Sequence, residues 1–210
     1  KTTVHHNCTK GESDDYGLIV IDSSSTIQLV SPLAKEQVSL DNGGGGNWGA
    51  SGGDADINQI KTVGVPPSSG ETKTTEEGVV RVPGDCNTLE EAVKRVHGDD
   101  CLTTIVLGEG EHVVALYQGE GGHDSNTLVI PAAMHIVGDP GVIKEKIVVV
   151  GGVYFNEGIL GNCHLQHLTL RRLKGNGVVG FSPFTMEDVL VEQCGGHGVL
   201  AIGTVVVVRC

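Results

Sequence analysis

The sequence repeats itself with a period of 21 residues towards its C-terminus. Residues 165–189, LQHLTLRRLKGNGVVGFSPFTMEDV, align with residues 186–210, MEDVLVEQCGGHGVLAIGTVVVVRC, so that Gly175 meets Gly196. Each unit holds a short alternating strand, a glycine corner and a second apolar strand. A unit this small cannot bury its apolar face alone. A period near 20 residues with several strands per unit therefore predicts a stacked β-solenoid.

The alternation within each unit predicts which side chains face the core of the stack. We expect two columns of inward residues: Leu168, Val189 and Cys210, and Leu170 with Val191. In the same register His167 lies over Asp188 and Arg171 over Glu192, both on the outside. Opposite charges on neighbouring coils help to set the register of the stack.

One helix is expected, over residues 88–97. Thr88 and Glu91 form an S/T-x-x-E capping box, and Gly98 suits the C-terminal end. The apolar stripe has helical spacing and contains Leu89, Ala92, Val93 and Val96. A short amphipathic helix ahead of the strands would cover the edge of the first coil.

The segments TLEEAVKRV, TTIVLGEGEH and LVIPAAMHIVGDPGV, followed by 21-residue coils, resemble the right-handed parallel β-helix of the pectin-lyase-like class. The resemblance covers residues 79–210. It implies an all-β fold, a right-handed parallel β-helix with coils of about 21 residues and one short capping α-helix. Such repeats recur in pectate lyases, polygalacturonases, epimerases, phage tailspikes and adhesins, so the resemblance speaks to fold and not to one activity.

The N-terminal residues resemble a further coil. TVHHNC and YGLIVIDSSSTIQLV follow the order of VLVEQCGGHGVLAIGTVVVV: strand, cysteine, polar insert, glycine, apolar strand, turn, apolar strand. We divide the chain into a coil-like segment with a glycine-rich loop (1–63), a polar linker (64–80), and the capping helix with its coils (81–210). The coil-like segment thus lies upstream of the cap.

The last strand, TVVVVRC, would leave an apolar edge open, which soluble proteins avoid. Two arrangements would cover it. Either the chain is a window from a longer tandem protein, or subunits stack head to tail, the N-terminal coil of one continuing the C-terminal coil of the next. The predicted assembly residues are Val4, Leu18, Val20, Ile27, Leu29, Val205, Val207 and Cys210.

The amino-acid composition limits which classes of partner the protein can bind. The net charge of -12 argues against nucleic acid and anionic membranes, which need a basic face. No apolar stretch approaches the ~20 residues of a membrane helix. The chain begins at Lys1 without an initiator methionine or a signal-peptide pattern, as expected of a processed chain or a piece of a longer one.

Enzymes of the class that the sequence resembles need clustered carboxylates, for Ca²⁺ or for acid–base work, with a nearby Arg or Lys. The candidates here are Asp14-Asp15, Asp54 with Asp56, Asp99-Asp100, and Asp188 with Glu192 beside Arg171-Arg172. We favour the simpler explanation that these are Asp residues in turns and acidic residues on a solvated outer face. We therefore predict no catalytic cluster, no metal and no cofactor.

Four further sequence features each allow a functional and a structural interpretation. His5 and His6 would point to opposite faces of a strand and make a poor metal pair, and His123 is not placed beside them. NGGGGNWG lacks a phosphate-binding pattern, so we expect a mobile loop or a surface cover anchored by Trp48. Asn7 opens an N-x-T sequon and would point outward. Cys194 and Cys210 are expected to pack as buried thiols rather than to form a disulfide.

We therefore predict a non-catalytic structural β-solenoid that stacks with itself head to tail or with adjoining repeats of a longer chain. The alternative is a β-helix protein that binds or cleaves polysaccharide. An extracellular or cell-surface location is expected.

Overall fold

The computed structural model describes the chain except residues 10–11, 65–77, 116, 119–123, 172–173 and 210. A 12-stranded sheet contains β1 (Thr3–His5), β3 (Thr26–Val30), β4 (Ser39–Leu40), β6 (Ile60–Val63), β7 (Val79–Val82), β8 (Thr104–Leu107), β9 (Gly110–Val113), β13 (His135–Gly138), β14 (Ile147–Val150), β16 (Cys163–Arg171), β18 (Phe184–Glu192) and β20 (Val205–Arg209). A six-stranded sheet contains β12 (Thr127–Ile130), β15 (Gly152–Phe155), β17 (Val178–Gly180), β19 (Val199–Ala201), β2 (Tyr16–Val20) and β5 (Gly46–Ala50).

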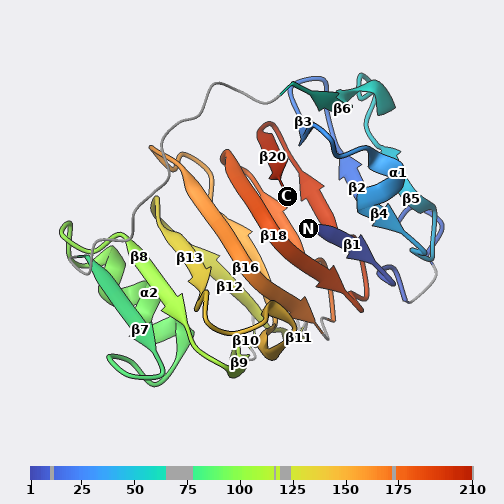
Figure 1. Cartoon of the computed structure of the whole chain (residues 1–210). Helices are drawn as coiled ribbons and strands as arrows, with labels where there is room; N and C mark the ends of the chain where they lie inside the picture. The colour runs from blue at the N-terminus through green and yellow to red at the C-terminus, as the bar shows by residue number, and fades with distance from the viewer. Residues whose placement is uncertain (10–11, 65–77, 116, 119–123, 172–173, 210) are drawn as a thin grey trace.

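Both sheets are paired in parallel, and their strands lie side by side in one long stack (Figure 1). Two small strands, β10 (Tyr117–Gln118) and β11 (Asp124–Ser125), form a separate antiparallel pair. The helical segments are α1 (Lys35–Val38), α2 (Leu89–His97) and the 3₁₀ turns η1 (Ile57–Gln59) and η2 (Lys144–Lys146). The fold is a largely β, parallel β-solenoid, as predicted.

Two long strands bend in the middle and so build two faces of the solenoid. The bends lie at His167 in β16 and Asp188 in β18, whose φ angles are +54° and +51°. Before its bend β16 pairs with β13, and after the bend it pairs with β14. The larger sheet is thus folded along a line of left-handed residues, and the six-stranded sheet forms a third face.

Helix α2 caps one end, as the sequence predicted. Thr88 Oγ1 accepts a hydrogen bond from the Glu91 amide, and the Glu91 carboxylate accepts one from the Thr88 amide. All four residues of the predicted apolar stripe are buried, and the helix packs on β7 and β8 (Figure 1). The helix therefore covers the first coil.

The 21-residue step is confirmed between β16 and β18, where Leu168 pairs with Val189. The next step is 22 residues, because Phe184 pairs with Val206. The corner before β20 is one residue longer than the corner before β18, and Gly203 takes a left-handed φ of +60° there. The predicted alignment of the last strand is therefore wrong by one residue. Other steps are longer still, with Gly110 pairing with Ile147.

The N-terminal segment continues the same stack within one chain. β1 lies between β18 and β4, β2 lies between β19 and β5, and β3 lies between β20 and β6. The three strands of this segment thus take the next position on the three faces of the stack. The chain ends, marked N and C, lie close together in the middle of the stack (Figure 1). Most of the predicted linker falls outside the described residues.

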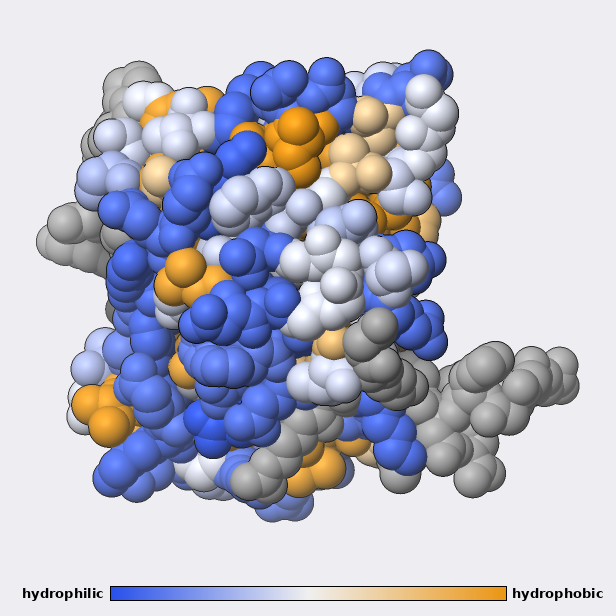
Figure 2. Space-filling view, turned by 90° about the vertical axis from the view of Figure 1, so that its right-hand side faces the viewer, coloured by the Kyte–Doolittle hydropathy of each residue, from blue (hydrophilic) through white to orange (hydrophobic). Residues whose placement is uncertain are grey.

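The glycine-rich segment, expected as a mobile loop or as a surface cover anchored by Trp48, continues into strand β5 from Gly46. β5 pairs with β2, and Trp48 lies opposite Leu18. A Cβ at Gly45 or Gly49 would come within 2.6 Å of the Tyr16 ring, so only glycine lets this backbone cross the ring. Lys35 of α1 lies 5.2 Å above the Trp48 ring. This end of the solenoid is largely hydrophilic (Figure 2).

The 22-residue step makes a testable distinction between two neighbouring valines. Val208 faces the core with no exposed surface, whereas Val207 faces outward and is partly exposed. Val→Thr keeps the branched shape and adds one hydroxyl. We expect Val208→Thr to lower the free energy of unfolding by about 1–3 kcal/mol. Val207→Thr should change it by less than about 0.5 kcal/mol. Urea unfolding measures the free energy of unfolding of both variants. A larger loss for Val207→Thr than for Val208→Thr would contradict the 22-residue step and favour the 21-residue alignment.

Candidate functional site

The two ends of the chain meet in a single coil. Arg209, the last residue of β20, lies opposite Glu187, and Thr3 at the start of β1 lies opposite Leu190. Thr2 lies between them: its hydroxyl donates to the Arg209 carbonyl at 2.5 Å and accepts from the Val189 amide at 3.3 Å. The strand that β20 begins is thus continued by β1. We treat this junction as the candidate functional site.

The predicted assembly residues lie at this junction. Five of them, from the N-terminal segment, face the core with no exposed surface: Val4, Leu18, Val20, Ile27 and Leu29. They pack against the C-terminal coils of their own chain, with Val4 opposite Val191, Leu18 opposite Val199 and Ile27 opposite Val206. In β20 the core-facing residues are Val206 and Val208 rather than the predicted Val207. Val205 opens β20 opposite Thr26, and Cys210 lies outside the described residues.

Asp188, at the bend of β18, joins three segments of the chain. Its carboxylate accepts hydrogen bonds from Lys144 of η2, from the N-terminal ammonium of Lys1, and from His167 Nδ1 at 2.7 Å. His167 Nε2 is 2.7 Å from the Val142 carbonyl. Burial would raise the pKa of Asp188, but these hydrogen bonds outweigh it and hold the pKa well below its usual range. The predicted stacking of His167 and Asp188 is confirmed.

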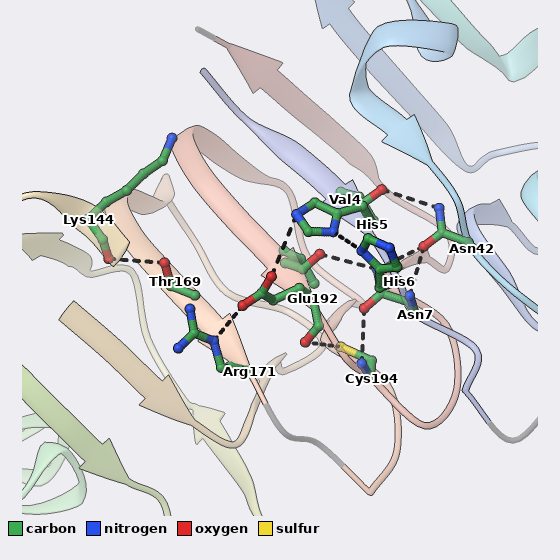
Figure 3. A network of polar contacts seen from close by, with 11 residues as sticks. Val4, His5, His6, Asn7, Asn42, Lys144, Thr169, Arg171, Glu192 and Cys194 are labelled. Atoms are coloured by element: carbon green, nitrogen blue, oxygen red, sulfur yellow. Dashed lines mark hydrogen bonds and ion pairs between the residues drawn. The ribbon is translucent and has the colours of Figure 1, made fainter. Parts of the chain in front are cut away.

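A second charged row lies along the outer side of β16, β18 and β1 (Figure 3). Arg171 Nε donates to Glu192 Oε1 at 2.5 Å, and His5 Nε2 lies 3.6 Å from Glu192 Oε2. The three residues are direct neighbours in the ladder, so the row crosses from the C-terminal coils onto the N-terminal segment. The predicted stacking of Arg171 and Glu192 is confirmed.

Asn7 points into the protein, whereas the sequon led us to expect an outward side chain. It is 1% exposed. Its Oδ1 accepts from the Cys194 amide at 3.1 Å, and its Nδ2 donates to the Val191 carbonyl at 3.2 Å and to Asn42 Oδ1 at 3.0 Å. At the corner after β1 the Asn7 side chain makes hydrogen bonds that backbone groups make elsewhere in the strand ladder. Glycosylation of Asn7 would require this corner to open.

His5 and His6 also differ from the prediction. His6 has a left-handed φ of +53°, so the two rings do not point to opposite faces. Their Nδ1 atoms are 2.5 Å apart and the rings meet edge to face (Figure 3). His5 is partly buried and His6 is exposed. His123 lies outside the described residues.

The other candidate carboxylates form local contacts or lie exposed on the surface. Asp56 accepts from the Asn58 amide and caps η1, and Asp99 accepts from the Cys101 amide in a turn. Asp15 lies 3.6 Å from His197, and Asp14, Asp54 and Asp100 are exposed. Arg172 lies outside the described residues. In the part of the chain that the structure describes, no three His, Cys, Asp or Glu side chains are grouped to hold a metal ion.

The described cysteines are free thiols, and three of them are buried: Cys8, Cys163 and Cys194. Burial, with the charge of Asp15 as a smaller cause, raises the pKa of Cys8 to about 12. Burial likewise raises the pKa of Cys194. Thiols with such pKa values pack as small apolar groups and are poor nucleophiles. The predicted burial of Cys194 is confirmed.

Sequence reasoning missed Lys144 of η2 and Asn42 of the loop after β4, which hold the junction together. Neither residue belongs to a repeat, so no periodic pattern pointed to them. Among the described helices, none has the length and apolarity to cross a membrane. No family model, no curated protein and no solved structure matches this chain.

Asp188 provides a pH-dependent test of the junction. Asp188→Asn keeps a residue that tolerates the left-handed backbone but removes the charge. We expect a loss of about 1–2 kcal/mol in the free energy of unfolding at pH 7. The lowered pKa means that wild-type Asp188 contributes stability above the unfolded pKa of about 4 and loses it as pH falls further.

Urea unfolding at pH 7 and near pH 3 measures this difference. The gap between the two proteins should narrow at the lower pH. Glu109→Gln, which removes an exposed pair with Lys146, is the matched control and should change little. An equal gap at both pH values would show that the Asp188 charge is not what stabilises the junction.

Proposed function

We propose that this chain is a non-catalytic structural β-solenoid, built to be extended end to end by a segment like its own residues 1–63. That segment comes from an adjoining repeat of a longer chain or from another copy. The observation that carries the proposal is the coil completed by β1, β2 and β3 next to β18, β19 and β20.

The junction offers a continuous edge to any segment of the right pattern. Three strands of the N-terminal segment take the next position on all three faces, in register with the coil beneath. Full burial of an aliphatic side chain contributes roughly 1.5–3 kcal/mol, and five such residues converge here. A segment fits this edge if its backbone can pair with the strands and its apolar residues face the core. Both requirements concern the segment itself, so a segment from another repeat or another copy can meet them.

The polar residues at the junction also favour a structural role. Asp188 and Glu192 each contact basic groups, so neither is a free carboxylate for acid–base chemistry. The same contacts tie the first residues of the chain to the C-terminal coils. Such pairs act on register and orientation more than on overall stability.

A joined chain tests the proposal. Two copies are linked so that Thr2 of the second directly follows Cys210 of the first, because the ladder leaves one position between Arg209 and Thr2. Val207→Cys in the first copy and Gln28→Cys in the second are direct ladder neighbours only if the second N-terminal segment completes the first coil. Cys86, Cys101 and every Cys210 are changed to Ser.

We expect a short bismaleimide to join the two engineered thiols, and negative-stain images to show particles about twice as long as the single chain. The same pair within one copy is the control for self-closure. Separate single-copy variants, mixed at high concentration, test the head-to-tail version. If the bismaleimide joins the control pair within one copy but not the two thiols on different copies, and the particles are uniformly short in both experiments, the proposal is overturned.

A second function, binding of polysaccharide, is favoured by one observation. The outer side of the six-stranded sheet carries an apolar stripe in which Tyr154 and Phe181 lie 5.2 Å apart beside Val179 and Leu200. The apolar face of an aromatic ring suits the apolar face of a sugar ring, and the Tyr154 hydroxyl adds one polar edge. The resemblance to the pectin-lyase-like class gives the substrate class, acidic polysaccharide.

Titration with polygalacturonate and alginate, with and without Ca²⁺, tests this alternative. Binding that is weakened at least tenfold by Tyr154→Ala and by Phe181→Ala, but not by Ile143→Ala at an exposed site, would support it. Unsaturated products or new reducing ends would extend it to cleavage. The absence of binding to both polymers would contradict it.

A further inference from the structure

We propose that His5 and His6 bind a divalent transition-metal ion through their two Nδ1 atoms, with water filling the remaining positions. Imidazole suits Zn²⁺, Cu²⁺ and Ni²⁺. The proposal is independent of the structural role, because a single chain contains the whole site.

The two nitrogens already converge on one point. Their separation is 2.5 Å, with the ring centres 4.7 Å apart and the rings at 82°. Metal–nitrogen bonds of about 2.1 Å place two nitrogens on one ion about 3 Å apart. A small opening of the two side chains therefore makes room for an ion. The left-handed backbone at His6 supplies this convergence, and the exposure of His6 gives access from solvent.

The proton balance needs no further reactant. His5 Nε2 faces the Glu192 carboxylate, which favours a proton on Nε2 and leaves the lone pair on Nδ1. In the Nδ1 to Nδ1 contact His6 is then the donor. When the ion binds, the His6 proton moves to its Nε2, and both Nδ1 lone pairs face the ion. A carboxylate behind a histidine ligand is the usual way to orient such a ring.

The charges around the pair suit a cation. Glu192 and Asp41 act on His5, and Arg171 is engaged with the far oxygen of Glu192. Burial lowers the pKa of His5, and the two carboxylates act in the opposite direction.

The second histidine pair is a less suitable site and serves as the control. His135 and His164 are ladder neighbours with ring centres 5.8 Å apart. His164 Nε2 is buried, and the charge of Arg209 acts on that ring. There the charge of Arg209 accompanies the Glu187 carboxylate, which lies 3.8 Å from the buried His164 Nε2. In contrast, Glu192 and Asp41 act on His5, and His6 is open to solvent.

The ion would also act on the junction. The His6 carbonyl accepts from the Gln193 amide at 3.1 Å, so the corner that carries the two rings is fixed to the C-terminal coil. Holding both rings on one ion holds this corner in its docked shape. Because an ion that binds only the folded state stabilises it, saturation should raise the midpoint of thermal unfolding.

The test uses the chain without a histidine tag. Calorimetric titration with Zn²⁺, Ni²⁺ and Cu²⁺ is made on the wild type, His5→Gln, His6→Asn and the double variant His135→Gln/His164→Gln. Asn at position 6 tolerates the left-handed backbone. We expect at least a tenfold loss of affinity in the first two variants and none in the double variant. Thermal unfolding without metal checks that each variant is folded.

A measurement on the wild type keeps the test independent of folding in the variants. Substoichiometric Cu²⁺ should broaden the imidazole proton signals of His5 and His6 before those of His135, His164 and the exposed His97. Broadening of other histidines first, or affinity unchanged in both His5→Gln and His6→Asn, would overturn the proposal.

Discussion

The structure depends on one constraint, that a parallel strand edge in the middle of the stack must meet another strand. Backbone groups of an unpaired edge need partners, and an apolar edge invites association. β20 would be such an edge, because it closes no coil of its own. In the structure it lies between β18 and β3, and the missing part of its coil is supplied by β1 and β2. The position of the N-terminal segment follows from this requirement.

The bends determine where polar chemistry can gather. Left-handed residues stand at equivalent corners, at His167 and Asp188 between two faces and at His6 and Gln193 between the next two. At such a corner side chains converge that a straight strand would send to opposite sides. The Asp188 contacts and the pair of His5 and His6 both arise in this way, and both lie where the N-terminal segment joins the coil.

Much of the fold could be predicted because it is periodic. The stacking of Leu168 on Val189, the charged pairs on the outside and the cap α2 all follow from spacing. Single-residue events could not be predicted. One extra residue before β20 shifted the last strand, and a left-handed backbone at His6 reversed the expected direction of its ring. Asn7 turned inward because its amide replaces ladder bonds at the same corner, a role that the sequon obscured.

The pattern also could not say whose segment completes the coil. In a solenoid each coil contacts only its neighbours. Strand pairing therefore selects the sequence pattern of the next coil, but it does not determine which chain that coil belongs to. Closure within one chain competes at an effective concentration on the order of millimolar for a short connection. Isolated copies below that concentration therefore favour closing on themselves. Extension is favoured when a preceding coil lies in the same chain, because that coil is then present at a similarly high effective concentration. In a tandem arrangement the same contacts would therefore join two successive repeats, whereas in an isolated copy they join the two ends of one chain.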